Sequence, residues 1–214
     1  MNRIICILIG YLFGLFQTGY LYGKLNKIDI RKHGSGNAGT TNALRTLGLK
    51  AGVITFIGDC LKCVIAVALV KFLFAGKCDD LSLLAMYAGA GVVLGHNFPF
   101  YLGFKGGKGI AATAGLVLAT DPIMFLIVAV VFIAIVAVTR YVSLGSLIIM
   151  IVYLVSVILY GQNGHFALGQ AELYELYGIA AVLTIMAFVR HSANIKRLLN
   201  GTENKISFRK KVAE

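Results

Sequence analysis

The sequence has few charged residues, and long stretches of it have none. Of 214 residues, 20 are Lys or Arg and nine are Asp or Glu, whereas 58% are hydrophobic. No charged residue occurs within residues 4–23, 81–104, 122–139 or 141–171. Each stretch is close to, or longer than, the roughly 20 residues that a helix needs to cross a bilayer core. This composition excludes an ordinary soluble domain and predicts a polytopic membrane protein.

The sequence also lacks the composition of a disordered chain or of a membrane barrel. Two prolines and 25 glycines exclude disordered and collagen-like chains. Lipid permits only helices or closed barrels as spanning structures, and the apolar runs here are continuous rather than alternating. We therefore expect an all-α polytopic membrane protein, with one integral membrane domain over residues 1–214. Seven spans are predicted, near residues 4–23, 51–74, 81–100, 109–120, 122–139, 143–160 and 173–189.

The fourth predicted span is the shortest. A dozen residues at about 1.5 Å each cover roughly 18 Å of a bilayer core near 30 Å. Residues 109–120 therefore either cross the membrane or form a re-entrant segment, and Asp121-Pro122 is a natural break after them. A crossing gathers the strongly basic connections on one face, so we expect it.

Most basic residues lie between the apolar runs. They are Lys24, Lys27, Arg31, Lys32, Arg45 and Lys50, then Lys105 and Lys108, then Arg140, and in the C-terminal tail Arg190, Lys196, Arg197, Lys205, Arg209, Lys210 and Lys211. Because Lys and Arg concentrate in cytoplasmic loops, we expect the N-terminus outside and the C-terminus in the cytoplasm.

Several catalytic signatures are missing. There is no HExxH, no GxSxG, no close acidic pair for two metals and no HxxxxD pairing. Metal hydrolysis and a carboxylate-oriented histidine base therefore lose support. The CxxC spacing of Cys60 and Cys63 lies in an apolar run and favours a structural role. Asp59 and Lys62 are three apart in the second span, which predicts a structural ion pair.

Residues 34–45, GSGNAGTTNALR, combine glycines, hydroxyls, amides and a basic residue. Glycines let backbone N–H groups approach an anion, and Arg45 can bind phosphate in a bidentate manner. The glycines match GxGxxG, but a dinucleotide fold needs a preceding strand, so we reject that interpretation. The remaining alternative is a polar connection with glycine turns.

Residues 95–109, GHNFPFYLGFKGGKG, place a glycine-flanked pair of lysines at a membrane boundary. The spacing is not that of a Walker loop. The lysines suit a phosphate or, alternatively, lipid headgroups. His96, near the end of a span, is either structural or functional.

Two further segments are RYVSLGS at 140–146 and RHSANIKRLLNGTE at 190–203. The first segment, taken alone, is weak evidence for a functional site, because Arg commonly flanks a span and Ser commonly lies between packed helices. In the second, His191 and Asn194 are three apart on one helical face. Its alternative is a basic helix end that anchors the last span.

The segments GSGNAGTTNALR, GHNFPFYLGFKGGKG and HSANIKRLLNGTE, in this order between apolar spans, resemble the bacterial membrane acyl-phosphate:glycerol-3-phosphate acyltransferases. The resemblance covers nearly the whole chain. It implies a seven-helix fold and transfer of a fatty acyl group from acyl phosphate to the 1-hydroxyl of glycerol 3-phosphate, giving 1-acylglycerol 3-phosphate. Ala38 stands where family loops often have proline, which removes no ligand.

From the motifs and the resemblance together we expect two sets of site residues. Those expected to be catalytic are Ser35, Arg45, Lys108, His191 and Asn194, and those expected to bind substrate are Gly36, Asn37, Asn42, His96, Gly106, Gly107, Gly109, Ser143, Ser146 and Glu203. We expect no metal or other cofactor and no covalent acyl-enzyme. The base is the donor's own phosphate or His191.

The expected partners are acyl phosphate, glycerol 3-phosphate and the lipid bilayer, with a functional link to a soluble acyl-phosphate-forming enzyme and no nucleic acid. The expected location is the bacterial cytoplasmic membrane, with the active site at the cytoplasmic face. One competing class is an organic-phosphate transporter, which lacks an evident inverted repeat here. Another is a structural or lipid-sensing protein, which leaves the polar loops without a role.

Overall fold

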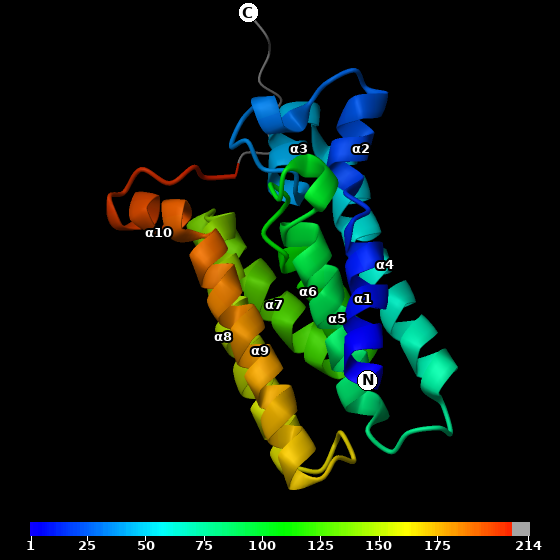
Figure 1. Cartoon of the computed structure of the whole chain (residues 1–214). Coiled ribbons are helices and arrows are strands. Elements are labelled where there is room, and N and C mark those ends of the chain that lie inside the picture. The colour runs from blue at the N-terminus through cyan, green and yellow to red at the C-terminus, as the bar shows by residue number, and fades with distance from the viewer. Residues whose placement is uncertain (207–214) are drawn as a thin grey trace, which may run out of the picture.

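A computed structural model describes residues 1–206, so Arg209, Lys210 and Lys211 of the basic tail lie outside the described residues. The described chain is helical throughout (Figure 1). Its elements are α1 (Asn2–Gly14), α2 (Thr18–Leu25), η1 (Ile30–Lys32), α3 (Thr40–Leu47), α4 (Leu49–Phe74), α5 (Leu81–Asn97), η2 (Phe100–Leu102), α6 (Ile110–Thr120), α7 (Pro122–Thr139), α8 (Val142–Gln162), α9 (Gln170–Arg190) and α10 (Ser192–Leu199).

Six helical segments in residues 1–206 are long and apolar enough to span a membrane. They are Asn2–Leu25, Leu49–Phe74, Leu81–Leu102, Pro122–Thr139, Val142–Gln162 and Gln170–Arg190. The predicted all-helical membrane protein is thereby confirmed. The expected fourth span is α6, an apolar helix of only 11 residues.

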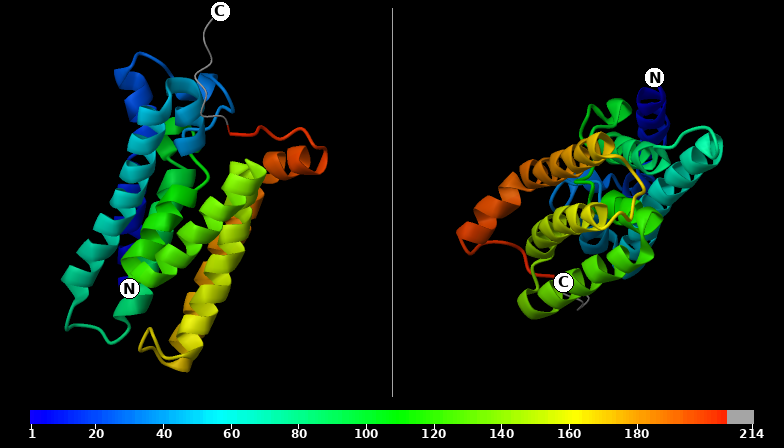
Figure 2. Two further views of the ribbon diagram at one scale, coloured as in Figure 1. Left: turned by 180° about the vertical axis from the view of Figure 1, so that it is seen from behind. Right: turned by 90° about the horizontal axis from the view of Figure 1, so that it is seen from below.

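Helix α6 nevertheless links the two ends of the bundle. At its C-terminus the Ala119 carbonyl accepts a 2.7 Å hydrogen bond from Lys71, which lies in the last turn of α4. Next to it, the Asp121 carboxylate lies 3.2 Å from His165 in the 163–169 loop. Figures 1 and 2 show α3, α10 and the loop before α6 at the other end of the bundle. We call this the motif end, and the end with loops 75–80 and 163–169 the opposite end.

Helix α5 is the most buried of the long helices and packs closely against α1. Each of the two helices carries a Gly-xxx-Gly pair at the contact, Gly10 with Gly14 and Gly91 with Gly95. A Cβ atom at any of these positions would come within 2.3 Å of a backbone carbonyl oxygen of the partner helix. Small residues therefore permit this contact, as is common between membrane helices.

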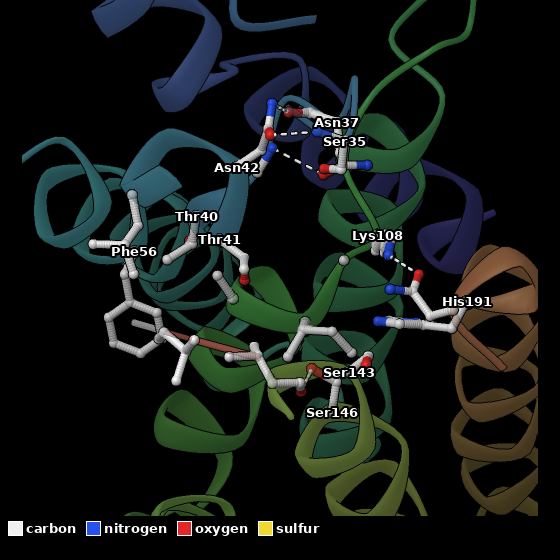
Figure 3. A pocket seen from close by; sticks show the side chains of 18 of the residues that line it. Ser35, Asn37, Thr40, Thr41, Asn42, Phe56, Lys108, Ser143, Ser146 and His191 are labelled. Atoms are coloured by element: carbon white, nitrogen blue, oxygen red, sulfur yellow. Dashed lines mark hydrogen bonds between the residues drawn. The ribbon is translucent and has the colours of Figure 1, made fainter. Parts of the chain in front are cut away.

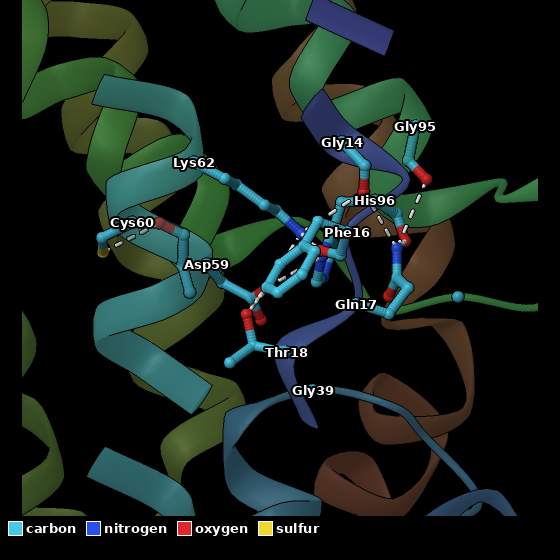
Figure 4. Close-up of polar contacts among 12 residues, drawn as sticks. Gly14, Phe16, Gln17, Thr18, Gly39, Asp59, Cys60, Lys62, Gly95 and His96 are labelled. Atoms are coloured by element: carbon cyan, nitrogen blue, oxygen red, sulfur yellow. Dashed lines mark hydrogen bonds and ion pairs between the residues drawn. The ribbon is translucent and has the colours of Figure 1, made fainter. Parts of the chain in front are cut away.

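The predicted single span over residues 4–23 is broken in the structure. Helix α1 ends at Gly14, α2 begins at Thr18, and the break releases backbone carbonyls inside the bundle. The Lys62 ammonium donates to the Phe16 carbonyl at 2.6 Å, and the buried Gln17 amide donates to the Gly14 carbonyl at 3.1 Å (Figure 4). A break in a membrane helix is tolerated where side chains satisfy the released groups in this way.

The predicted ion pair within the second span is confirmed. The Lys62 ammonium lies 2.8 Å from a carboxylate oxygen of Asp59, and both side chains are buried. The same ammonium lies 2.9 Å from Nδ1 of His96 on α5. One buried charge pair thus joins α4, α5 and the break between α1 and α2.

Candidate active site

The four sequence motifs meet around one cavity of about 320 Å³ at the motif end. Figure 3 shows Ser35, Asn37 and Asn42 on one side, Lys108 and His191 on another, and Ser143 and Ser146 on a third. Twelve of the expected site residues line it: Ser35, Asn37, Asn42, Arg45, His96, Lys108, Gly109, Ser143, Ser146, His191, Asn194 and Glu203. Gly36, Gly106 and Gly107 do not.

Asn42 organises the first motif. Its amide oxygen accepts from the Ser35 backbone N–H at 2.8 Å, and its amide nitrogen donates to the carbonyls of Ile30 and Asn37 at 2.8 and 2.9 Å. Gly34 has φ +59°, and a Cβ atom there would lie 2.3 Å from the same amide oxygen. Asn42 therefore holds the loop that presents Ser35, because its amide groups are already engaged.

Two helices begin at the cavity. Helix α3 starts at Thr40 and α6 at Ile110, and both residues line the cavity. The first N–H groups of a helix have no intrahelical partner, and the helix dipole adds positive potential there. Two helix N-termini facing one cavity favour an anionic ligand.

The second motif is clamped from both sides. The Arg190 guanidinium donates to the Gly106 carbonyl at 3.1 Å and to the Gly107 carbonyl at 2.7 Å. The N–H groups of these glycines donate to the carbonyls of Asn97 and His96. A Cβ atom at Gly107 would lie 1.9 Å from Nε2 of His96. The two glycines thus pack the loop and place Lys108, while their amides are already used.

Lys108 begins a chain of polar contacts that joins the second and fourth motifs. Its ammonium donates to the Asn194 amide oxygen, and the Asn194 amide donates to Glu203 at 3.0 Å. The other Glu203 oxygen accepts from Arg197 at 2.8 Å. Burial lowers the pKa of Lys108 to about 8, so the group remains mostly protonated at pH 7.

His191 presents an unprotonated nitrogen to the cavity. Its Nδ1 lies 2.7 Å from the Ala187 carbonyl, which can only accept, so Nδ1 carries the hydrogen. Burial, with a smaller effect from the Lys108 ammonium, lowers the pKa of His191 to about 4. The ring is therefore neutral at pH 7, and Nε2 can accept a hydrogen bond or a proton.

The third motif and an apolar wall complete the cavity. The Ser146 hydroxyl donates to the Val142 carbonyl at 2.8 Å, whereas the buried Ser143 hydroxyl has no partner among residues 1–206. Phe56 from α4 and Phe132 and Val136 from α7 form the wall. Phe56 is 41% exposed on the surface of a membrane helix, so the cavity extends toward the lipid.

Sequence reasoning missed part of this site. Thr40 and Thr41 are among the hydroxyl residues of the first motif but are absent from the expected set, although both line the cavity. Asp59 was assigned only to an ion pair, yet it lines the cavity as well. The apolar wall has no sequence signal, because its residues look like ordinary lipid-facing side chains. Arg190 is the first residue of the 190–203 motif but is absent from the expected set, and its place in that motif is the one sequence signal for its contacts with Gly106 and Gly107.

Fold and site together define a class of protein: an integral, multi-pass membrane protein with a cavity that is suited to an anionic ligand at its polar side and is apolar at the other. Among residues 1–206, no three His, Cys, Asp or Glu side chains gather as metal ligands. The cavity's helix N-termini and basic side chains instead fit a ligand that carries phosphate.

Comparisons with known proteins specify the family. The family model described as glycerol-3-phosphate acyltransferase matches residues 4–201. The glycerol-3-phosphate acyltransferase of Clostridioides difficile (strain 630) is 44% identical over 210 residues, which cover 98% of each chain. That of Bacillus subtilis (strain 168) is 40% identical over 203 residues, covering 94% of this chain and 96% of the relative.

Two crystal structures of PlsY (YgiH), an integral membrane glycerol 3-phosphate acyltransferase, have the same fold. The glycerol 3-phosphate form gives a TM-score of 0.82 at 34% identity, covering 97% of this chain and 96% of that chain. The lysophosphatidic acid form gives 0.80 at 33% identity and covers 97% of both. The present chain belongs to the glycerol-3-phosphate acyltransferase family. The expected family and enzyme class are confirmed.

Proposed function

We propose that the protein transfers a fatty acyl group from acyl phosphate to the 1-hydroxyl of sn-glycerol 3-phosphate. The products are 1-acylglycerol 3-phosphate, which is lysophosphatidic acid, and inorganic phosphate. The two related crystal structures are described as a glycerol 3-phosphate form and a lysophosphatidic acid form. Acyl phosphate as the donor follows from the family that the motifs resemble.

One observation carries the proposal: a single cavity joins phosphate ligands to a lipid-facing wall. Arg45, Lys108 and two helix N-termini lie at its polar side, and Phe56, Phe132 and Val136 at its apolar side. Both substrates carry phosphate, and only the donor carries a long acyl chain. Binding them side by side places the 1-hydroxyl against the acyl carbonyl, and such alignment is a large part of catalysis. The cations stabilise the departing phosphate.

The proton of the 1-hydroxyl needs an acceptor. The donor's own phosphate is one candidate, because it is bonded to the reacting carbonyl carbon. When that carbon–oxygen bond breaks, the oxygen that remains on the phosphate can take the proton. His191 is the alternative, since its Nε2 is unprotonated at pH 7 and its ring is only 3% exposed. In either case the acyl group passes directly to the hydroxyl without a covalent acyl-enzyme.

The proposal includes an orientation in the membrane. Helix α6 forms a seventh passage, which places the N-terminus outside and the motif end in the cytoplasm, where Lys and Arg concentrate. In a bacterial cytoplasmic membrane, a soluble enzyme that forms acyl phosphate then supplies the donor from the same side. The apolar wall lets the acyl chain remain in the bilayer while the headgroup reacts at the interface.

The test is a defined reaction with purified protein in detergent or lipid. Palmitoyl phosphate and labelled glycerol 3-phosphate are supplied, and labelled lysophosphatidic acid and released phosphate are measured. We expect product from the unaltered protein and about 100-fold less from Arg45→Ala. In the same assay, turnover retained in His191→Ala favours the donor phosphate as base. No product from folded protein, or product only with palmitoyl-CoA, contradicts the proposed donor.

A further inference from the structure

Asp59 uses only one of its two carboxylate oxygens. Oδ1 accepts from the Thr18 hydroxyl at 3.1 Å and from the Lys62 ammonium at 2.8 Å (Figure 4). Oδ2 has no hydrogen-bond partner among residues 1–206, although the side chain is 99% buried, with 1% exposed. An unpaired buried oxygen of a charged group is costly, so this one calls for a ligand.

Lys62 is not free to supply the missing contact. Its ammonium already meets the Phe16 carbonyl at 2.6 Å, Nδ1 of His96 at 2.9 Å and Oδ1 of Asp59. The Gly14 carbonyl lies 3.4 Å from the same nitrogen, so the three hydrogens of the ammonium group are already engaged. The second oxygen of Asp59 therefore has no protein partner among residues 1–206, and Asp59 itself lines the cavity.

The chemistry of the cavity limits what Asp59 can bind. A carboxylate repels phosphate and accepts hydrogen bonds from hydroxyl groups. Arg45, Lys108 and the helix N-termini are suited to the phosphates. Of the two substrates proposed above, only the acceptor carries hydroxyls, at carbons 1 and 2. The 1-hydroxyl must give its proton to the base, which leaves the 2-hydroxyl.

We propose that Oδ2 of Asp59 accepts a hydrogen bond from the 2-hydroxyl of glycerol 3-phosphate and thereby selects the acceptor and its reacting hydroxyl. This inference rests on the proposed function and adds a specificity-determining residue to it. It also gives the buried Asp59–Lys62 pair a purpose beyond packing: the ammonium fixes one oxygen of the carboxylate so that the other faces the substrate.

The experiment compares two acceptors. One is glycerol 3-phosphate, and the other is 3-hydroxypropyl phosphate, which lacks only the 2-hydroxyl. The measured quantity is the ratio of their kcat/KM values with palmitoyl phosphate as donor. We expect the unaltered protein to prefer glycerol 3-phosphate by about 10- to 100-fold, because a site built for a hydroxyl rejects an analogue without it. A ratio near one in the unaltered protein overturns the inference without any variant.

Two variants locate the source of the preference. Asp59→Asn keeps the shape and replaces a charged hydrogen bond with a neutral one, so the ratio falls to a few-fold. The double variant Asp59→Ala/Lys62→Met removes both charges together, which avoids leaving a buried charge unpaired, and the ratio falls to about one. A purely structural role lowers activity with both acceptors equally and leaves the ratio unchanged.

Ser143→Ala is the matched comparison, because the Ser143 hydroxyl also lines the cavity without a partner among the described residues. We expect its ratio to stay close to that of the unaltered protein. A ratio that collapses in Ser143→Ala but not in Asp59→Asn overturns the inference. Failure of the unaltered protein to acylate either acceptor contradicts the proposed function instead, so the two failures are distinguishable.

Discussion

Charged side chains are arranged differently at the two ends of the bundle. At the opposite end, charged side chains satisfy one another: the Arg3 guanidinium meets both oxygens of Glu175, at 2.5 and 2.8 Å, and Tyr87 donates to the same carboxylate. At the motif end, Arg45 and Lys108 line a cavity whose Asp59 and Ser143 carry polar atoms without partners among residues 1–206.

This difference in the pairing of charges distinguishes residues that hold helices together from residues available to a ligand. Paired charges at the opposite end connect α1 to α5 and α9, and Arg3 also lies 3.8 Å from the Asp80 carboxylate. At the motif end, the first residues of α3 and α6, two cations and Asp59, whose Oδ2 has no partner among residues 1–206, line the same cavity. Buried polar groups are normally satisfied, and unsatisfied oxygens on Thr40, Asp59 and Ser143 in the described chain belong to residues that line the cavity, which favours a ligand there.

The largest expected effect is the loss of a cation at the motif end. Lys108→Met removes a charged contact to substrate phosphate, and such contacts contribute about 2–4 kcal/mol in an enclosed site. We expect kcat/KM for glycerol 3-phosphate to fall by about 100-fold or more. Lys71→Met is the control: Lys71 is also half-buried and hydrogen-bonded to a carbonyl, but at the opposite end. Equal losses in both variants contradict a division of labour between the ends.

A smaller effect is expected from pH. Burial lowers the pKa of the Lys108 ammonium to about 8, so raising the pH through 8 removes the charge that we propose binds phosphate. We expect KM for glycerol 3-phosphate to be nearly constant from about pH 7 to 7.5, where its phosphate is mostly doubly ionised, and to rise up to about 10-fold per pH unit above 8. Lys108→Arg keeps its charge at these values, and its KM profile is expected to be flat. The same rise in that variant assigns the effect to another group.

How much was predictable depends on whether a feature is local in the sequence. Runs without charge predict the helices, and the glycine, amide and basic motifs predict most of the cavity lining, because residue type and spacing determine both. The break at residues 15–17 is not local: the apolar run continues through it, and it is stabilised by Lys62, 45 residues or more away along the chain.

Asp59 shows the same limit within the site. Its spacing to Lys62 correctly predicts an ion pair, but nothing in that spacing tells that only one carboxylate oxygen is used. Likewise, Asn42, Gly106 and Gly107 have residue types suited to phosphate, and only the folded chain shows that other protein groups occupy their amides. Sequence identifies the polar groups of a site, whereas their availability depends on packing between distant segments.

The smallest effect is expected at the opposite end itself. Glu175→Gln removes the ion pair with Arg3, whose two side chains are 42% and 31% exposed, so the pair contributes about 0.2–1 kcal/mol. We expect the melting temperature in detergent to fall by about 1–4 °C and the acyltransferase activity to stay within about twofold of the unaltered protein. Arg3→Gln should give an equal or slightly larger shift, since it also removes the 3.8 Å ion pair between Arg3 and Asp80. If activity falls as far as in Lys108→Met while the protein remains folded, the charges at the opposite end act on the site, and the separation of the two ends is wrong.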